Sequence, residues 1–356
     1  MALSDVWFVL IAALWAGYFV LEGFDFGVGI LFPVLGRDDV DRRVMLNTIG
    51  PVWDGNETWV VVAGAGTFAA FPAWYASMFS GLYLALLLVL VSLILRGVAF
   101  EFRGKGRSDR WKRNWDRAIF WGSLLPAVLW GVAFANILRG LPIGADQEVH
   151  ATFLSLLNPY GLLGGLTTLA LFVTHGAVFL ALKTVGEIRE RARRIGWVAG
   201  ILAAVLAVAF LAWTQSMRFD ATGAGIAVAA AVAFLAGLLA NRSGREGVAF
   251  TATAVTLALA VASLFVTLYP AVLPSSTDPA FDLTVHNASS SPYTLRVMSI
   301  VALVFLPVLV GYQAWSYYVF RKRIGREHIP PEVPVLAAPG HPGAAVASGD
   351  GETGGG

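Results

Sequence analysis

The chain has 356 residues, of which 57% are hydrophobic and 13% charged, and its formal net charge is +2 at pH 7. This near-neutral balance argues against a nucleic-acid-binding protein, because such proteins carry a clear excess of clustered basic residues. The sequence contains no cysteine, which excludes disulfides, a thiolate nucleophile and a cysteine-ligated iron–sulfur cluster.

Nine apolar segments have the length and composition of membrane-spanning helices. In chain order they are residues 6–31, 52–71, 76–100, 117–138, 159–183, 196–217, 222–240, 248–270 and 296–320. We therefore expect an all-α integral membrane protein with one transmembrane domain over residues 1–329, arranged as two four-helix bundles plus one peripheral helix. Beyond it the sequence is rich in Pro, Gly and Ala, which predicts a disordered cytoplasmic tail over residues 330–356.

The distribution of basic residues predicts the orientation of these spans. If the N-terminus is outside, all but three of the 25 Lys and Arg residues fall on cytoplasmic segments. The three exceptions are Arg139, Arg218 and Arg296. Membrane proteins concentrate Lys and Arg in their cytoplasmic loops. The sequence therefore predicts nine spans with the N-terminus outside and the C-terminus inside.

Carboxylates in the first two spans are the most unusual feature of the apolar segments. Glu22 and Asp25 lie toward the cytoplasmic end of the first span, and Asp54 and Glu57 open the second span from the same side. Asp54 and Glu57 are three residues apart and so share one face of a helix. Ionisable groups at this depth are costly unless they face protein or water.

Two interpretations of these acids stay open. In the first, they stabilise helix starts and loops: Asp54 complements the positive end of its helix, and Arg96 at the end of the third span pairs with an acid. In the second, Asp25, Asp54 and Glu57 form a hydrated chain of carboxylates that carries protons inward from the cytoplasmic face.

Aromatic and histidine residues in the spans offer further candidates. Trp53 and Trp59 bracket the acids of the second span, where they would either anchor the helix at the membrane interface or stack on a quinone. His175 is the only histidine within a span, either as a hydrogen-bonded packing residue or with a role in proton transfer or cofactor binding. A haem with two protein ligands needs His or Met facing the core, and no span pairs histidines. We therefore expect no metal ligand, no bound haem and no catalytic residue in this chain.

Several motifs together resemble subunit II of the cytochrome bd quinol oxidase family. They are Glu22–Gly29, Arg42–Asn47, Gly50–Trp59, Phe71–Ala76, Leu95–Arg103 and Gly131–Asn136, and the match is close over residues 15–137. Thr174–Ala177 and Leu182–Thr184 extend the resemblance more weakly. Beyond the sixth span it is one of length and hydropathy.

The resemblance implies a function that the residues alone do not show. Such oxidases oxidise quinol and reduce dioxygen to water in a prokaryotic plasma membrane, and they take the protons for water from the inner side. In this family subunit I holds two b haems and one d haem. Subunit II, also with nine helices, is the scaffolding partner that packs against subunit I in the lipid bilayer.

The resemblance also assigns roles to individual residues. Asp54, in the Trp-Asp-Gly-Asn motif, would lie on the proton path, with Asp25 as its neighbour nearer the entrance. Trp53 and Trp59 would contact a structural quinone that some members hold in subunit II. Glu57 stands where some members carry an uncharged residue, and it either adds a proton site or shifts the local charge balance.

Two other functions remain as alternatives. A proton-coupled secondary transporter would use buried acids, but transporters often carry broken helices in both halves, whereas these acids cluster in the first half. A purely structural membrane partner subunit would account for the missing cofactor ligands but not for the clustered acids.

Overall fold

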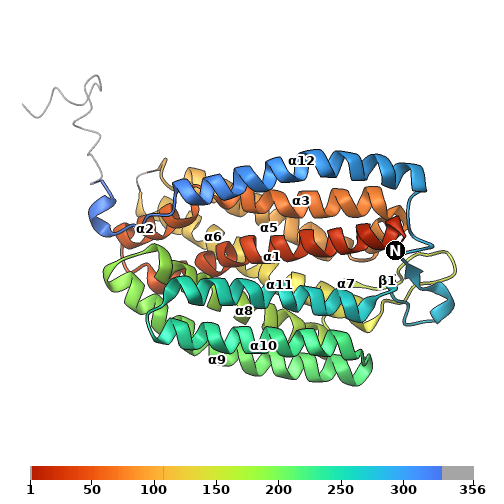
Figure 1. The fold of residues 1–356 in the computed structure, drawn as a ribbon. Coiled ribbons are helices and arrows are strands. Elements are labelled where there is room, and N and C mark those ends of the chain that lie inside the picture. The colour runs from red at the N-terminus through yellow and green to blue at the C-terminus, as the bar shows by residue number, and fades with distance from the viewer. Residues whose placement is uncertain (1, 107, 331–356) are drawn as a thin grey trace, which may run out of the picture.

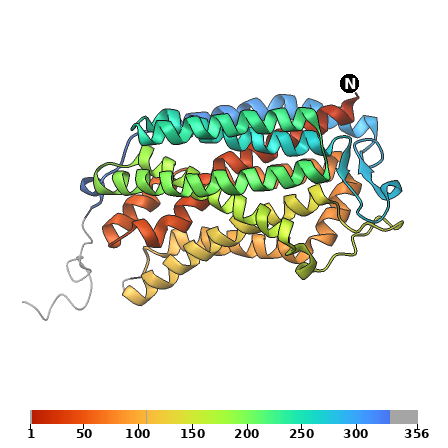
Figure 2. The same cartoon turned by 90° about the horizontal axis from the view of Figure 1, so that it is seen from below.

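The computed structural model describes residues 2–106 and 108–330, and most of this chain is helical (Figure 1). The long helices run side by side as one elongated bundle (Figures 1 and 2). Helix α2 (Asp39–Ile49) lies at one end of the bundle and strand β1 (Ala271–Leu273) at the other. The expected all-α architecture is confirmed. Of the tail expected over residues 330–356, only residue 330 is among the described residues.

The other elements follow in chain order. The helices are α1 (Leu3–Leu35), α3 (Trp53–Ala70), α4 (Pro72–Gly81), α5 (Tyr83–Phe102), α6 (Asp109–Arg139), α7 (Phe153–Leu156), α8 (Pro159–Lys183), α9 (Gly186–Met217), α10 (Ala221–Arg242), α11 (Glu246–Leu268) and α12 (Pro292–Val319). Strand β2 (Leu283–Thr284) pairs antiparallel with β1. Two 3-10 turns, η1 (Pro279–Phe281) and η2 (Arg326–His328), complete the described chain.

Eight of the described helices are long and apolar enough to cross a membrane, namely α1, α5, α6, α8, α9, α10, α11 and α12. Helix α3 corresponds to the second expected span but is not among the eight. It has only 18 residues, and Asp54, Asn56 and Glu57 lower its hydropathy. It ends before Phe71 because a residue that precedes proline, here Pro72, is disfavoured in helical conformation.

The third expected span, over residues 76–100, differs in the structure. The helix is interrupted at Leu82, so that α4 and α5 are separate helices joined by this one residue. Leu82 has φ −98° and ψ 15°, which lies outside the helical region. Hydropathy does not reveal such a break, because apolar residues continue on both sides of it.

Helix α1 is the central element of the bundle, and it packs against α3, α6, α8 and α11. Its contact with α8 depends on two glycines that face each other. A Cβ atom on Gly27 would lie 2.0 Å from the carbonyl oxygen of Phe172, and one on Gly176 would lie 2.6 Å from the Cα atom of Gly27. Because no side chain fits there, the two backbones approach closely.

Helix α12 is the opposite case. Only 6% of its most apolar stretch is buried within the chain, compared with 72% for α6. It contacts α3 and α1 along one side, and near its start the indole nitrogen of Trp7 donates a hydrogen bond to the hydroxyl of Ser299 at 3.0 Å. Most of its apolar surface therefore faces away from this chain.

Ion pairs tie the helices together at the end of the bundle that carries α2. They join α2 to the α5–α6 connection, to the start of α9 and to η2. The pairs are Arg42–Asp116 at 2.8 Å, Arg103–Asp116 at 2.5 Å, Arg103–Asp39 at 2.8 Å, Arg191–Asp41 at 2.8 Å and Arg326–Asp41 at 2.5 Å. All of these residues lie in or next to segments that the sequence predicts to be cytoplasmic.

Candidate functional site

A fully buried ion pair forms the centre of the candidate site. Arg96 on α5 donates a hydrogen bond from Nη2 to Oε1 of Glu22 on α1, and neither side chain is exposed. The same nitrogen lies 3.3 Å from Oε2 of Glu57 on α3, whose side chain is 22% exposed. The guanidinium group also packs over the ring of Phe26, 4.7 Å from its centroid. One cation thereby joins α1, α3 and α5 inside the bundle.

Asp25 lies three residues further along α1 than Glu22 and is also fully buried. Its Oδ2 accepts a hydrogen bond from Nδ2 of Asn56 on α3 at 2.7 Å. The Oδ1 atom of Asn56 in turn accepts from Nε2 of Gln313 at 2.8 Å and from the hydroxyl of Tyr317 at 2.7 Å, both on α12. A continuous set of hydrogen bonds therefore links the buried Asp25 to the peripheral helix.

The site has unused hydrogen-bonding capacity on both the cation and the acids. Within the described part of the chain, Oε2 of Glu22, Oδ1 of Asp25, and Nε and Nη1 of Arg96 are buried without a hydrogen-bond partner. Buried polar atoms in proteins normally bond to other protein groups or to ordered water. Donors and acceptors thus lie in one buried region, as proton exchange through hydrogen bonds requires.

The other sequence-predicted residues of α3 are spread around the helix. Asp54 is exposed, and its carboxylate accepts a hydrogen bond from the backbone N–H of Gly55 at 2.7 Å. The ring of Trp53 packs edge-on against Phe100, with 5.2 Å between centroids. Trp59 lines a groove of about 640 Å³ between α1, α3 and α12. The structure therefore brings Glu57 and Asp25 to the buried cluster, whereas Asp54 lies on the surface near it.

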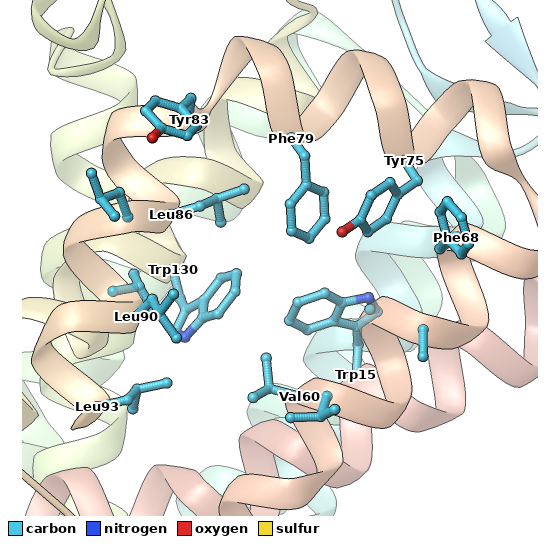
Figure 3. A pocket seen from close by; sticks show the side chains of 15 residues that line it. Trp15, Val60, Phe68, Tyr75, Phe79, Tyr83, Leu86, Leu90, Leu93 and Trp130 are labelled. Atoms are coloured by element: carbon cyan, nitrogen blue, oxygen red, sulfur yellow. The ribbon is translucent and has the colours of Figure 1, made fainter.

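A second apolar cavity lies on another side of α3, with a volume of about 600 Å³ (Figure 3). The rings of Trp15 and Trp130 form one wall, and the stacked rings of Tyr75 and Phe79 lie opposite them. Leucine side chains of α5 such as Leu90 close another side. The lining is almost entirely apolar, so the cavity suits a hydrocarbon chain rather than a polar molecule.

The sequence matches a protein-family model described as cytochrome bd terminal oxidase subunit II over residues 3–320. The chain belongs to this family. Cytochrome bd ubiquinol oxidase subunit 2 of Bacillus subtilis (strain 168) is 45% identical over 331 residues, covering 92% of this chain and 98% of the relative. Cytochrome bd-I ubiquinol oxidase subunit 2 of Escherichia coli (strain K12) is 36% identical over 365 residues, covering 92% of this chain and 96% of the relative.

A solved structure of the bd oxidase from Geobacillus thermodenitrificans has the same fold. One of its chains superposes with a TM-score of 0.75 at 19% sequence identity, and the match covers 90% of this chain and 99% of that chain. The family match confirms the resemblance and extends it well beyond the motifs of residues 15–137. The family match and the eight apolar helices together identify this chain as a multi-pass protein of the bacterial plasma membrane and as a subunit of an oxidase complex.

His175 of this subunit II does not fit a haem ligand. Its Nδ1 lies 2.7 Å from the hydroxyl of Thr253, and its Nε2 lies 3.1 Å from the carbonyl oxygen of Val20. The imidazole also stacks on Phe250, with 4.8 Å between ring centroids. Both ring nitrogens are therefore engaged by neighbouring groups of this chain. Over the described ranges, no group of three or more His, Asp or Glu residues is placed to hold a metal ion.

Sequence reasoning missed three polar residues that organise the subunit II site. Asn56 appeared only as part of a motif, and Gln313 and Tyr317 were not singled out. Gln313 and Asn56 are 257 residues apart in the chain. The available signal was a glutamine within the otherwise apolar last span, where a polar side chain usually has a partner on another helix.

Proposed function

We propose that this chain is the non-haem subunit II of a bd-type terminal quinol oxidase, which oxidises quinol and reduces dioxygen to water in aerobic respiration. It scaffolds the haem-bearing subunit I, its partner in the membrane, and supplies a proton path from the cytoplasmic side. Subunit I holds the two b haems and the d haem, and the redox chemistry takes place there. Family membership supports the complex, and the buried acid cluster supports the proton path.

The proposed topology counts α3 as the ninth span, with the N-terminus outside, the C-terminus inside and a single transmembrane domain over residues 1–329. Helix α3 packs along α1 and α12. Asn56 and Glu57 at its start face Asp25 and Arg96 inside the bundle, whereas Asp54 is exposed. The ion pairs around α2 and the basic residues of the same end support a cytoplasmic location for it. The other helices form two four-helix bundles, with α12 as the peripheral helix.

The buried cluster is the observation that carries the proton path. Glu57 is partly exposed and lies 3.3 Å from Arg96, which also bonds the fully buried Glu22. Asp25 lies next to them on α1 and keeps one carboxylate oxygen without a partner among the described residues. Carboxylates that share one cation at this depth interact strongly, and a proton exchanged at one of them affects the others.

Within this path Asp54 is the surface residue. This reverses the order that the resemblance implied, in which Asp25 lay nearer the entrance, because Asp25 is fully buried and Asp54 is exposed. Asp54 stands at the start of α3, one helical turn before Glu57. An exposed carboxylate there receives protons from the cytoplasm and passes them through water to Glu57 and then to the buried acids Glu22 and Asp25. The path therefore runs from Asp54 through Glu57 to Asp25, with Glu22 beside it and Arg96 holding Glu22 and Glu57 in place.

A structural quinone is a second part of the proposal. Trp59 lines the groove between α1, α3 and α12, which has an almost entirely apolar lining. Trp53 lies at the start of the same helix, beside Phe100. A quinone ring stacked on Trp59 would leave its isoprenoid chain in apolar surroundings, which is the usual composition of a cofactor site. Trp53 packs on the α5 side and does not line this groove.

Co-purification and substitution together test this function. When a tagged chain is purified from its native membrane, we expect a haem-bearing polypeptide to come with it, and the isolated chain to show no haem absorption. In the assembled complex, Asp25→Asn and Asp54→Asn should slow oxygen consumption while the haem content stays the same. Stoichiometric haem on the isolated chain contradicts the assignment of the haems to subunit I, and unchanged turnover removes the substituted acid from the path.

A further inference from the structure

In its C-terminal half, helix α12 makes a polar contact with the interior of the bundle, although most of the helix faces outward. Gln313 and Tyr317 lie one helical turn apart, and both donate hydrogen bonds to Oδ1 of Asn56. The amide of Gln313 lies over Gly55, where its Oε1 would be 3.1 Å from an added Cβ atom. The ring of Tyr317 packs edge-on against Phe24 of α1 at 6.4 Å. The contact is therefore specific in both packing and hydrogen bonding.

The orientation of the Asn56 amide decides what it offers to Asp25. An asparagine presents either a nitrogen donor or an oxygen acceptor, and its partners indicate which. The Nδ2 atom lies 3.4 Å from the backbone carbonyl oxygen of Leu21, which accepts but never donates. On its other side the amide meets Tyr317 and Gln313, which have hydrogens to donate. All of these contacts agree on one orientation, in which the N–H points to Asp25.

We propose that Gln313 and Tyr317 are positioning residues for Asp25 and act on it through Asn56. The two donors on α12 hold the amide oxygen on their side and so hold the amide N–H on the carboxylate. Hydrogen bonds in a chain also polarise one another, so the two bonds at the oxygen strengthen the one at the nitrogen. Without them only the 3.4 Å contact with the Leu21 carbonyl and the bond to Asp25 itself favour this orientation. The reversed amide would offer its oxygen, and only a protonated Asp25 makes a hydrogen bond to an oxygen.

Other charged and titratable side chains around Asp25 also influence its proton affinity. The charged or titratable side chains that face it are Glu22 of its own helix, Glu57 of α3, Arg96 of α5 and Tyr317 of α12. His175 of α8 directs both ring nitrogens elsewhere. Among the side chains that the structure describes, Asn56 is the one that donates a hydrogen bond to Asp25. A change at Asn56 therefore acts on the carboxylate directly.

The test uses the assembled oxidase with Tyr317→Phe and Gln313→Met, singly and together, each in the native sequence and in an Asp25→Asn background. Phenylalanine keeps the ring of Tyr317 and methionine keeps the length of Gln313, so the packing of α12 is preserved. Tyr312→Phe is the matched control, because it removes a hydroxyl from an exposed ring of the same helix. The readouts are haem content and the pH profile of oxygen consumption.

We expect the double variant to move the midpoint of the pH profile at constant haem content. The shift should correspond to about a three- to tenfold change in proton binding, the effect of one hydrogen bond. Tyr317→Phe alone should give part of this shift, which keeps the test decisive if the double variant fails to assemble. In the Asp25→Asn background the α12 substitutions should have no further effect, because the group on which they act is absent.

The inference rests on the proposed role of Asp25, and the two fail in different ways. If Asp25→Asn slows turnover while the α12 variants leave the pH profile unchanged, the inference is wrong and the proton path stands. A shift that persists in the Asp25→Asn background also overturns it, since α12 then acts through another group. If Asp25→Asn itself leaves oxygen consumption unchanged, the role of Asp25 fails and the inference falls with it.

Discussion

Arg96 and Glu22 form an ion pair in which neither side chain is exposed to solvent, and it joins α5 to α1 in the interior of the bundle. Taking two charges out of water is expensive, and the cost is recovered only when the partners stay together. Glu57 supplies a second acceptor from α3. Arg96 is therefore the residue on which the geometry of the acid cluster depends.

The first prediction concerns the loss of this cation. Arg96→Met should destabilise the subunit by about 3–5 kcal/mol, because it leaves the buried Glu22 without its partner. The measurement is the thermal midpoint of the purified complex, followed by loss of haem absorbance. Arg43→Gln is the control, since Arg43 makes no ion pair with any residue that the structure describes. Equal thermal midpoints for Arg96→Met and Arg43→Gln would show that the Arg96–Glu22 ion pair contributes little to stability.

The second prediction distinguishes the role of Glu57 from that of Asp54. Both substitutions, Glu57→Gln and Asp54→Asn, are expected to slow oxygen consumption. Glu57→Gln should also lower stability by up to about 1 kcal/mol, because it weakens a partly exposed ion pair with Arg96. Asp54→Asn should change stability by less than about 0.5 kcal/mol, as surface substitutions usually do. Parallel melting and turnover measurements check this, and a loss of stability in Asp54→Asn would favour a structural role for that residue.

Local sequence patterns could predict the helices of the bundle but not the contacts between them. Apolar runs of spanning length mark the nine segments, because the bilayer sets their length. The break at Leu82 has no such signature, since it leaves the hydropathy unchanged. Asp54 and Glu57 were expected on one face of α3, yet Glu57 contacts Arg96 while Asp54 is exposed. Three residues turn a helix through about 300°, so the two side chains still differ by 60° in direction.

The candidate site was predictable only in part for the same reason. Acids in an apolar segment point to a functional region through the cost of burying them, and this identified Asp25 and Glu57. The polar partner of Asp25 is Asn56, whose own partners Gln313 and Tyr317 lie on the last helix. Pairing between helices so far apart in the chain depends on packing across the bundle, which no local pattern records.

Quinone binding gives a third prediction. Trp59→Leu should lower the amount of quinone recovered from the purified complex by several-fold, because it removes one of the two tryptophan rings that line the groove between α1, α3 and α12. Trp53→Leu should have a smaller effect, because Trp53 packs against Phe100 of α5 and does not line this groove. Solvent extraction and chromatography measure the quinone per haem. Trp121→Leu, at an exposed tryptophan of α6, is the control, and equal quinone in all variants would exclude this groove as the site.

The fourth prediction is a pH dependence at the cytoplasmic end. A hydrogen bond from Arg326 lowers the pKa of Asp38 below its ordinary value. Because the pKa is lower in the folded state, the contact is fully stabilising above the ordinary pKa of about 3.9. It is lost as the pH falls through the lowered value. The protection of residues 321–330 against hydrogen exchange, relative to the intrinsic exchange rate at each pH, should therefore fall only in strong acid.

Two substitutions test the cause of that pH dependence. Arg326→Gln should lower the protection of residues 321–330 at neutral pH as well, because it removes the ion pairs that join Arg326 to Asp38 and Asp41, although Arg191 still pairs with Asp41. Lys322→Gln changes an exposed side chain of the same segment and should leave the exchange slow. If both variants exchange alike, the segment is held by its backbone contacts, such as the hydrogen bond from Ile324 to Lys183 at 2.8 Å.

The fifth prediction tests the close approach of α1 and α8. Gly27→Ala places a Cβ atom where the backbone of α8 lies, 2.0 Å from the carbonyl oxygen of Phe172, and backbone cannot move aside as a flexible side chain does. Overpacking of this kind costs about 1–3 kcal/mol or more, so the variant should assemble poorly or melt well below the native complex. Gly225→Ala is the matched control, since a Cβ atom there meets no atom within 4 Å. If both variants melt at the native temperature, the helices are able to separate at this point without loss. That result would contradict a tightly packed α1–α8 contact behind the acid cluster.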